Sequence, residues 1–175
     1  MDWRTLRSKR LIFEPLSEDI LNDMHTYVSD EDVSRFIGWP LTKELEETKD
    51  YLNKLFENEK NKTHEYASMV FDGRHIGTVM LFNFSYEAKN LEIGYVMHRD
   101  FWHKGLMTEA VSLMMDYIEK ETDFHKVCAR VVSGNMASGK VLEKNGFDRE
   151  GLLKDQYYID NKYYDALYYG KIINR

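Results

Sequence analysis

The sequence predicts one α+β domain built around a mixed sheet. Segments with helical and with strand periodicity alternate along the chain. Two strand-like runs, Glu65–Phe71 and His75–Phe84, flank Asp72-Gly73, a dipeptide that favours a hairpin and hence antiparallel pairing. Between Leu91 and Val132 a strand, a helix and a strand follow one another, which predicts a parallel pair with a right-handed crossover. We therefore expect a mostly antiparallel mixed sheet of about seven strands, flanked by four helices.

Composition is that of an ordinary globular protein. Of the 175 residues, 43% are hydrophobic and 31% are charged, and only two are proline, so we expect a single domain over residues 1–175. One cysteine, Cys128, excludes an intrachain disulfide and suits a cytoplasmic location. No apolar run is long enough to span a membrane. The basic N-terminal stretch MDWRTLRSKR leads into no apolar signal core.

Charge and histidine spacing narrow the class of partner. The formal net charge is −6, whereas nucleic-acid binding usually needs a basic face, so we expect neither a nucleic-acid nor a membrane partner. Excess negative charge suits a cationic or amine-bearing substrate. The six histidines show no spacing typical of metal ligands, so we expect no metal.

The first half of the chain reads as a strand followed by two helices. Residues Arg10–Leu16 form the strand, and Ser17 is a suitable N-cap for a helix that continues to Val28. Ser34–Pro40 is a loop or a short helical turn, after which Thr42 caps the second helix. The apolar face of that helix consists of Tyr51, Leu52, Leu55 and Phe56.

The second half contains two further helices and four further strands. Ser85–Asn90 is a turn into the strand Leu91–His98, and a helix begins after Gly105. The apolar face of this helix consists of Leu106, Ala110, Leu113, Met114, Tyr117 and Ile118. The strand His125–Val132 follows.

A fourth helix and a hairpin complete the predicted fold. Asn135 caps the helix, which ends near Asn145-Gly146. The final strands are Phe147–Ile159 and Tyr163–Ile173, joined by Asp160-Asn161.

The stretch Leu91–Val111, LEIGYVMHRDFWHKGLMTEAV, has the makings of an anion site. A strand leads through Lys104 and Gly105 into a helix, whose first turn carries unpaired N–H groups and the positive end of the helix dipole. One glycine and one lysine are also compatible with a plain strand-to-helix turn, so the local pattern alone leaves both interpretations open.

Four segments together resemble one family. The opening strand RLIFEPL, the core stretch EIGYVMHRDFWHKGLMTEA, the segment NMASGKVLEKNGF and the ending EGLLKDQYYIDNKYYDALYYGKI are similar to the GNAT superfamily of acetyl-CoA-dependent N-acetyltransferases. Within it they resemble the ribosomal-protein N-terminal (Rim-type) acetyltransferases. The resemblance covers nearly the whole chain. It implies a GNAT-like single domain that uses acetyl-CoA as co-substrate and an amine as acceptor.

The family's phosphate loop has the pattern Gln/Arg-x-x-Gly-x-Gly/Ala. Here the matching residues run from Trp102 to Met107: Gly105 matches, and Trp102 is common at the first position of Rim-type members. His103 stands where glycine is usual, and Met107 where glycine or alanine is usual. A larger side chain is compatible with a site made of backbone N–H groups, provided that it points away from the pyrophosphate.

The resemblance implies a set of cofactor contacts. Met97 would offer backbone hydrogen bonds to the pantetheine arm and the thioester carbonyl, and Asn135 and Ser138 would contact the same arm. The pyrophosphate would be held by the N–H groups of His103, Lys104, Gly105, Leu106, Met107 and Thr108. If the resemblance is set aside, the residues have ordinary structural roles: Asn135 is a helix N-cap, and Ser138 makes a hydrogen bond to the backbone or to solvent.

The proton-transfer groups are less clear from the family pattern. Many members use a tyrosine on the fourth helix as the acid, but this chain has Leu142 there; Ser138 matches the serine to which Rim-type enzymes give that role. The Rim-type base, a glutamate, falls at Tyr157, with Asp155 expected on the same strand face. Glu92 is a further candidate base, and its alternative role is a cross-strand ion pair.

The acceptor can be narrowed by amine chemistry. A site without an obvious strong base suits an α-amine, which is partly neutral at neutral pH, so we expect a protein or peptide N-terminus. The alternatives are a small-molecule amine such as a polyamine, an amino sugar or an antibiotic, and a CoA-binding sensor with little turnover. Phe36, Trp39 and the tyrosines of the last hairpin are candidates for lining the acceptor cleft. Aromatic surface on that hairpin would also suit a homodimer.

Overall fold

A seven-stranded sheet forms the centre of the molecule. A computed structural model describes residues 2–37, 41–159 and 161–173. The strands are joined in the order β1-β2-β3-β4-β5-β7-β6, and every neighbouring pair is antiparallel except β4 with β5. The predicted mixed, mostly antiparallel sheet is therefore confirmed. The strands are β1 (Leu11–Pro15), β2 (His64–Phe71), β3 (Arg74–Ser85), β4 (Asn90–Met97), β5 (Lys126–Val132), β6 (Asp148–Ile159) and β7 (Lys162–Ile172).

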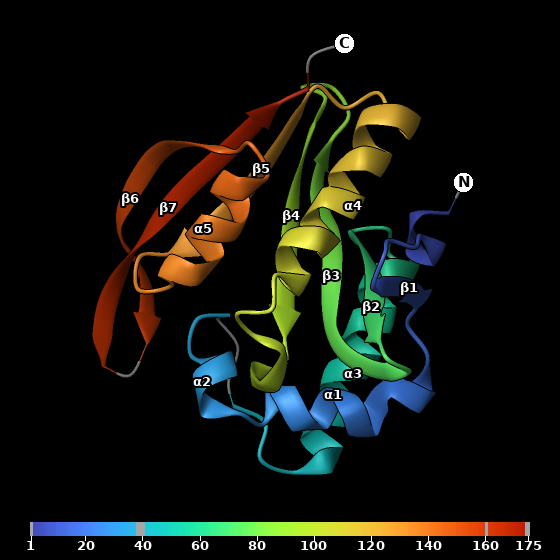
Figure 1. The fold of residues 1–175 in the computed structure, drawn as a ribbon. Helices are drawn as coiled ribbons and strands as arrows, with labels where there is room; N and C mark the ends of the chain where they lie inside the picture. The colour runs from blue at the N-terminus through green and yellow to red at the C-terminus, as the bar shows by residue number, and fades with distance from the viewer. Residues whose placement is uncertain (1, 38–40, 160, 174–175) are drawn as a thin grey trace.

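Helices cover both faces of this sheet (Figure 1). The four long ones were expected: α1 (Leu21–Val28), α3 (Leu45–Lys60), α4 (Leu106–Glu121) and α5 (Met136–Lys144). A fifth, α2 (Glu31–Ser34), is a single turn that the hydrophobic pattern did not predict. It begins because the Asp30 carboxylate accepts the Asp32 N–H at 2.9 Å.

Two helix starts differ from the prediction. The N-cap of α3 is Glu44 rather than Thr42, because the Glu47 carboxylate accepts the N–H groups of Lys43 and Glu44 at 2.6 and 3.0 Å. A charged carboxylate is a stronger acceptor than the neutral Thr42 hydroxyl. Ser17 precedes a short 3-10 turn ahead of α1, and its side chain makes no capping bond.

The alternation of side chains along β4 separates two apolar cores. Leu91 and Ile93 point toward α4 and belong to the larger cluster, whereas Val96 points toward α1 and α3 and belongs to the smaller one. Trp102, just after β4, contacts both clusters. The end of β4 therefore lies where both cores meet.

The sheet divides into two halves that separate from one another. β4 pairs with β5 only from Asn90–Lys126 to Glu92–Cys128. Beyond that point β4 stays with β3, while β5 stays with β7 along its whole length. Figure 1 shows β5, β7 and β6 leaning away from β4, with α5 beside them. We call the region between the diverging strands β4 and β5 the wedge.

The core beneath α4 should dominate stability. Met114 is fully buried in the larger cluster, so Met114→Ala should lower the free energy of unfolding by about 2–5 kcal/mol. Ser112, two residues away on the exposed side of α4, is the control, and Ser112→Ala should change it by less than about 0.5 kcal/mol. Urea unfolding measures both. Equal effects would contradict the placement of the core.

Candidate active site

The turn into α4 has the backbone conformation that a phosphate loop needs. Gly105 has φ +74° and His103 has φ +60°, so both lie in the left-handed region. Histidine is among the residues that adopt this region most readily after glycine, which explains why it can stand where the family pattern has glycine. The side chains of His103 and Lys104 are exposed.

The next two residues turn inward. Leu106 is fully buried and Met107 is 6% exposed, and both belong to the larger core. The bulky residue at the family's small position therefore packs into the protein and leaves the start of the helix open.

The N-terminus of α4 is uncapped by any side chain. Gly105 is the N-cap residue and makes no side-chain bond, and the first helical backbone bond runs from the Glu109 N–H to the Gly105 carbonyl at 3.1 Å. The N–H groups before Glu109 have no intrahelical acceptor. A helix of 16 residues adds its dipole at the same point, which makes this end a suitable anion site.

An arginine from the start of β1 holds this loop in place. The Arg10 Nε donates to Glu109 at 2.6 Å, and its Nη1 donates to the Lys104 carbonyl at 2.9 Å. Burial opposes ionisation of Glu109, but hydrogen bonds from Ser8 and Arg10 outweigh it, so the pKa of this carboxyl lies below its usual value. The Glu109 charge is thus paired with the Arg10 guanidinium. The partners are 99 residues apart, so sequence reasoning missed them.

A hollow of about 500 Å³ adjoins the loop. Asn145 closes one side, because its amide donates to the Thr108 carbonyl at 3.2 Å and ties the end of α5 to the start of α4. Arg7 and Lys144 give the hollow two cations. Its lining consists of Arg7, Ser8, Gly105, Thr108, Glu109, Ser112, Leu113, Asp116, Lys144 and Asn145.

The edge of β4 that faces the wedge carries unused ladder positions. The His98 N–H donates to the Ile76 carbonyl on the β3 side at 2.8 Å. Because peptide groups alternate between the two edges, the N–H and C=O of Tyr95 and Met97 point to the other edge, toward β5. The ladder with β5 has already ended at Glu92.

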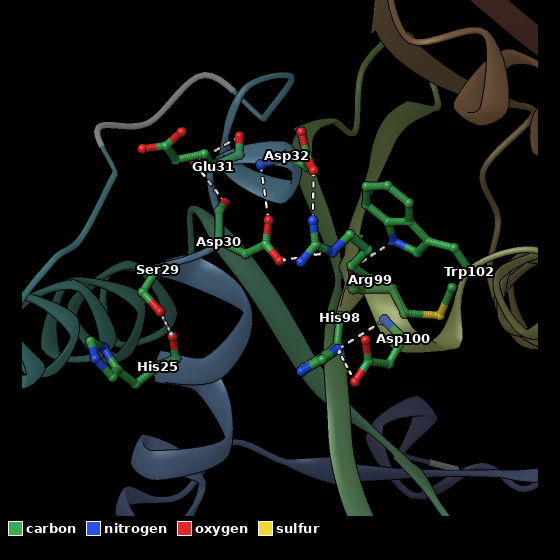
Figure 2. A network of polar contacts seen from close by, with 11 residues as sticks. His25, Ser29, Asp30, Glu31, Asp32, His98, Arg99, Asp100 and Trp102 are labelled. Carbon is green, nitrogen blue, oxygen red and sulfur yellow. Dashed lines mark hydrogen bonds and ion pairs between the residues drawn. The ribbon is translucent and has the colours of Figure 1, made fainter.

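Figure 2 shows how the segment after β4 is braced. The Trp102 indole N–H donates to the Met97 carbonyl at 2.9 Å, which leaves the Met97 N–H on the open edge. Arg99 reaches the carboxylates of Asp30 at 3.2 Å and Asp32 at 2.7 Å, so it links this segment to the start of α2. The end of β4 and the loop that follows are therefore held from both sides.

Across the wedge, the start of α5 is tied to β4. The Asn135 side-chain oxygen accepts the Ser138 N–H at 3.2 Å, which confirms Asn135 as a helix N-cap. The Ser138 Oγ lies 2.9 Å from the Tyr95 hydroxyl, and the same hydroxyl donates to the Ser138 carbonyl at 3.1 Å. The sequence singled out Ser138 but not Tyr95. Alternation along a strand predicts the face on which Tyr95 lies, but not the residue that it contacts.

The two candidate bases lie together on the opposite face of the sheet. Glu92 accepts from the Arg130 Nε at 2.9 Å and from the Asn83 amide at 3.0 Å, so it forms the cross-strand ion pair considered as its alternative role. Burial raises the pKa of Tyr157, although the Arg130 charge opposes this. β6 shifts register between Leu153 and Tyr157, and Asp155 has φ +50°. The regular alternation of side chains is interrupted there, so it no longer predicts that Asp155 and Tyr157 share a face of the strand.

Aromatic residues near the wedge come from distant segments. Phe36, just after α2, makes an edge contact with Tyr164 of β7 at a ring separation of 6.4 Å. A side chain at Gly134 would collide with the Phe36 ring, so these segments fit closely. Trp39 and Asp160, named in the predictions, lie outside the described residues.

Within the described ranges, no group of three His, Cys, Asp or Glu side chains could hold a metal ion. None of the helices in the described part of the chain has the length and apolar character needed to cross a bilayer.

Comparison with known families shows to which family the chain belongs. The model of the "Acetyltransferase (GNAT) domain" family matches residues 10–148, most of the chain. The chain belongs to the GNAT acetyltransferase family.

Similar curated proteins are N-acetyltransferases. A "Probable N-acetyltransferase YjcK" of Bacillus subtilis (strain 168) is 39% identical over 103 residues, a match that spans 57% of each chain. An "Uncharacterized N-acetyltransferase p20" of Bacillus licheniformis is 26% identical over 153 residues, 86% of each chain. By family and by kinship, this GNAT protein is an N-acetyltransferase.

Solved structures share the whole fold. A GNAT-family acetyltransferase from Bacillus anthracis covers 97% of this chain and 99% of its own, with TM-score 0.84 and 25% identity. RimL, a ribosomal L7/L12 α-N-protein acetyltransferase in complex with coenzyme A, covers 97% of both chains, with TM-score 0.86 and 21% identity. A spermidine N-acetyltransferase from Vibrio cholerae covers 95% of this chain and 97% of its own, with TM-score 0.81 and 18% identity.

One departure from the GNAT pattern is now placed in the structure. Leu142, where many members have a tyrosine, is fully buried on the core side of α5. Helix α5 therefore brings no phenol at this position to the wedge. The Tyr95 phenol, which comes from β4, lies 2.9 Å from the Ser138 hydroxyl at the start of α5.

Proposed function

We propose that this GNAT protein transfers the acetyl group of acetyl-CoA directly to a primary amine, and that the acceptor is a protein or peptide N-terminal α-amine. One observation carries the proposal. The open edge of β4 runs to the uncapped N-terminus of α4, so a single continuous site offers backbone donors both for a thioester arm and for phosphates.

Each part of acetyl-CoA finds a matching surface in this site. The pyrophosphate would lie on the N–H groups from His103 to Thr108, and the nucleotide would extend into the hollow with Arg7 and Lys144. The pantetheine arm would take up the ladder positions of β4 left open toward β5. The Met97 N–H would meet the thioester carbonyl, and the first turn of α5, with Asn135 and Ser138, would cover the arm.

Gly105 allows a test in which only charge differs. Gly105→Asp and Gly105→Asn introduce side chains of nearly equal size at the same left-handed position, where a Cβ would meet only Arg10, at an ordinary 3.6 Å. The aspartate should weaken acetyl-CoA binding at least about tenfold relative to the asparagine, because it places a negative charge beside the phosphates. Titration calorimetry measures both constants. Equal affinities would move the phosphates away from this loop.

The chemistry requires a neutral amine, a stabilised oxyanion and a stabilised leaving thiolate. The Met97 N–H would serve the oxyanion, and the Ser138 hydroxyl would serve the thiolate. Neither predicted base is free: both oxygens of Glu92 accept hydrogen bonds, and the raised pKa of Tyr157 keeps its phenol protonated at neutral pH. The acceptor should therefore be an amine of which a sizeable fraction is already neutral when it binds.

This requirement favours an α-amine over a lysine side chain. An α-amine with a pKa near 8 is about one tenth neutral at pH 7, whereas a lysine amine is neutral in only about one part in a few thousand. The difference corresponds to roughly 3 kcal/mol that the site need not supply. The name of RimL, an α-N-protein acetyltransferase, agrees with this acceptor class.

A polyamine or another small-molecule amine is the second candidate. The protein carries a net charge of −6, which favours cationic acceptors, and the spermidine N-acetyltransferase of Vibrio cholerae shares the fold.

An acceptor panel separates these candidates. Release of the CoA thiol should be fastest with peptides that have a free α-amine, and kcat/KM should rise with pH and level off above about 8. Matched peptides with an acetylated N-terminus and an internal lysine are the control and should react at least about tenfold more slowly. Faster turnover of spermidine would favour the second candidate. Binding of acetyl-CoA without turnover of any amine would favour the sensor.

Ser138 should affect turnover more than binding. Ser138→Ala should lower kcat by about 10- to 100-fold, because a hydrogen bond to a developing charge is lost, and should leave the KM for acetyl-CoA within about twofold. Steady-state kinetics give both values. An unchanged kcat would remove Ser138 from the reaction.

A further inference from the structure

The bond between Tyr95 and Ser138 joins the two sides of the wedge. Tyr95 lies on β4 and Ser138 lies one turn into α5, 43 residues later. We propose that Tyr95 is a positioning residue that turns the Ser138 hydroxyl toward the sulfur of the leaving CoA thiolate. This inference rests on the proposed acetyl transfer. It adds that Tyr95 orients the Ser138 hydroxyl, which would bond to the thiolate.

Tyr95 controls the direction of the Ser138 hydroxyl proton through its own hydrogen bonds. Each hydroxyl has one proton to donate, and the Tyr95 oxygen has two partners within reach: the Ser138 Oγ at 2.9 Å and the Ser138 carbonyl at 3.1 Å. When Tyr95 donates to the carbonyl, the serine proton must point back at the phenol oxygen. When Tyr95 donates to Oγ, the serine proton is released to point elsewhere.

A thiolate in the wedge would favour the second arrangement. As the tetrahedral intermediate collapses, the C–S bond breaks and its electron pair goes to sulfur, while the attacking nitrogen gives its extra proton to solvent. The new negative charge attracts the serine O–H, and Tyr95 then donates to the serine oxygen. Two aligned hydrogen bonds in series polarise one another and spread the charge.

The phenol keeps its proton throughout. Burial raises the pKa of Tyr95 well above its ordinary value, and the bond to Ser138 opposes this only in part. A thiol is the stronger acid of the two, so full transfer of the tyrosine proton to the thiolate would be unfavourable. Tyr95 therefore acts through Ser138 by orientation, and it does not replace the absent tyrosine at position 142 as an acid.

The bound CoA thiol reports this role without any acceptor. The ultraviolet absorbance of the thiolate gives the pKa of the CoA thiol in its complex with the protein. In the wild type this pKa should lie below that of free CoA, and Tyr95→Phe should raise it by about one unit, a tenfold change in the ionisation constant. Ser138→Ala should raise it as well, and the double variant should show no further increase.

A second tyrosine whose hydroxyl bonds to α5 provides the control. The Tyr169 hydroxyl of β7 donates to Glu143 of α5 at 3.3 Å, so Tyr169→Phe also removes one phenol bond to α5 but keeps both partners of the Tyr95–Ser138 bond. It should not change the thiol pKa. Thermal unfolding of every variant checks that the fold is retained.

Turnover supplies the second readout. Tyr95→Phe should lower kcat about tenfold with the KM for acetyl-CoA within about twofold, and should have no further effect in the Ser138→Ala background. If the two effects multiply, or if Tyr95→Phe leaves both the thiol pKa and kcat unchanged, the positioning role is overturned while acetyl transfer stands. If CoA does not bind to the wild type, the proposed function fails, and this role fails with it.

Discussion

The shortness of the pairing between β4 and β5 is the constraint on which the rest of the site depends. Only three residue pairs join the two strands, and beyond them β4 continues along β3 while β5 continues along β7. A continuous ladder would take up the Tyr95 backbone groups and the Met97 N–H that point toward β5. The early end of the ladder leaves donors and acceptors on a strand edge inside the protein, where a ligand can pair with them.

An open wedge needs supports at its borders, and the structure provides them with polar contacts. Arg10 joins β1 to the start of α4, and Arg99 joins the end of β4 to α2. Tyr95 joins β4 to α5. Side-chain bonds of this kind are individually modest, so they position the segments around the wedge while the buried cores supply most of the stability.

Electrostatics at the site follow the same arrangement. The one acidic residue in the first turn of α4 is Glu109, and Arg10 neutralises it, so the positive end of the helix stays available to an anion. On the other face, Arg130 holds the Glu92 carboxylate. The two faces therefore differ in character: the α4 side presents the positive end of a helix, whereas the Glu92 side presents a paired charge.

The sequence by itself determined the features that depend on neighbouring residues. Periodicity placed all seven strands and the four long helices, and the Asp72-Gly73 turn, the Asn135 cap and the glycine at the start of α4 followed from local backbone chemistry. Local rules failed where a stronger hydrogen-bond acceptor lay nearby. The Glu47 carboxylate accepts the Glu44 N–H, so α3 is capped at Glu44 and not at Thr42. They also failed for α2, whose single turn is too short to show a period.

Only the tertiary structure decided which side chains meet. The partners of Ser138 and Glu109 lie 43 and 99 residues away, and nothing within their own segments specifies them. The inward turn of Met107 and the ion pair of Glu92 likewise depend on strand register and helix packing, which are set when the whole sheet assembles. Propensity and turn chemistry act over a few residues, whereas these contacts exist only once distant segments have been brought together. That is why the sequence suggested a candidate site but not the contacts that surround it.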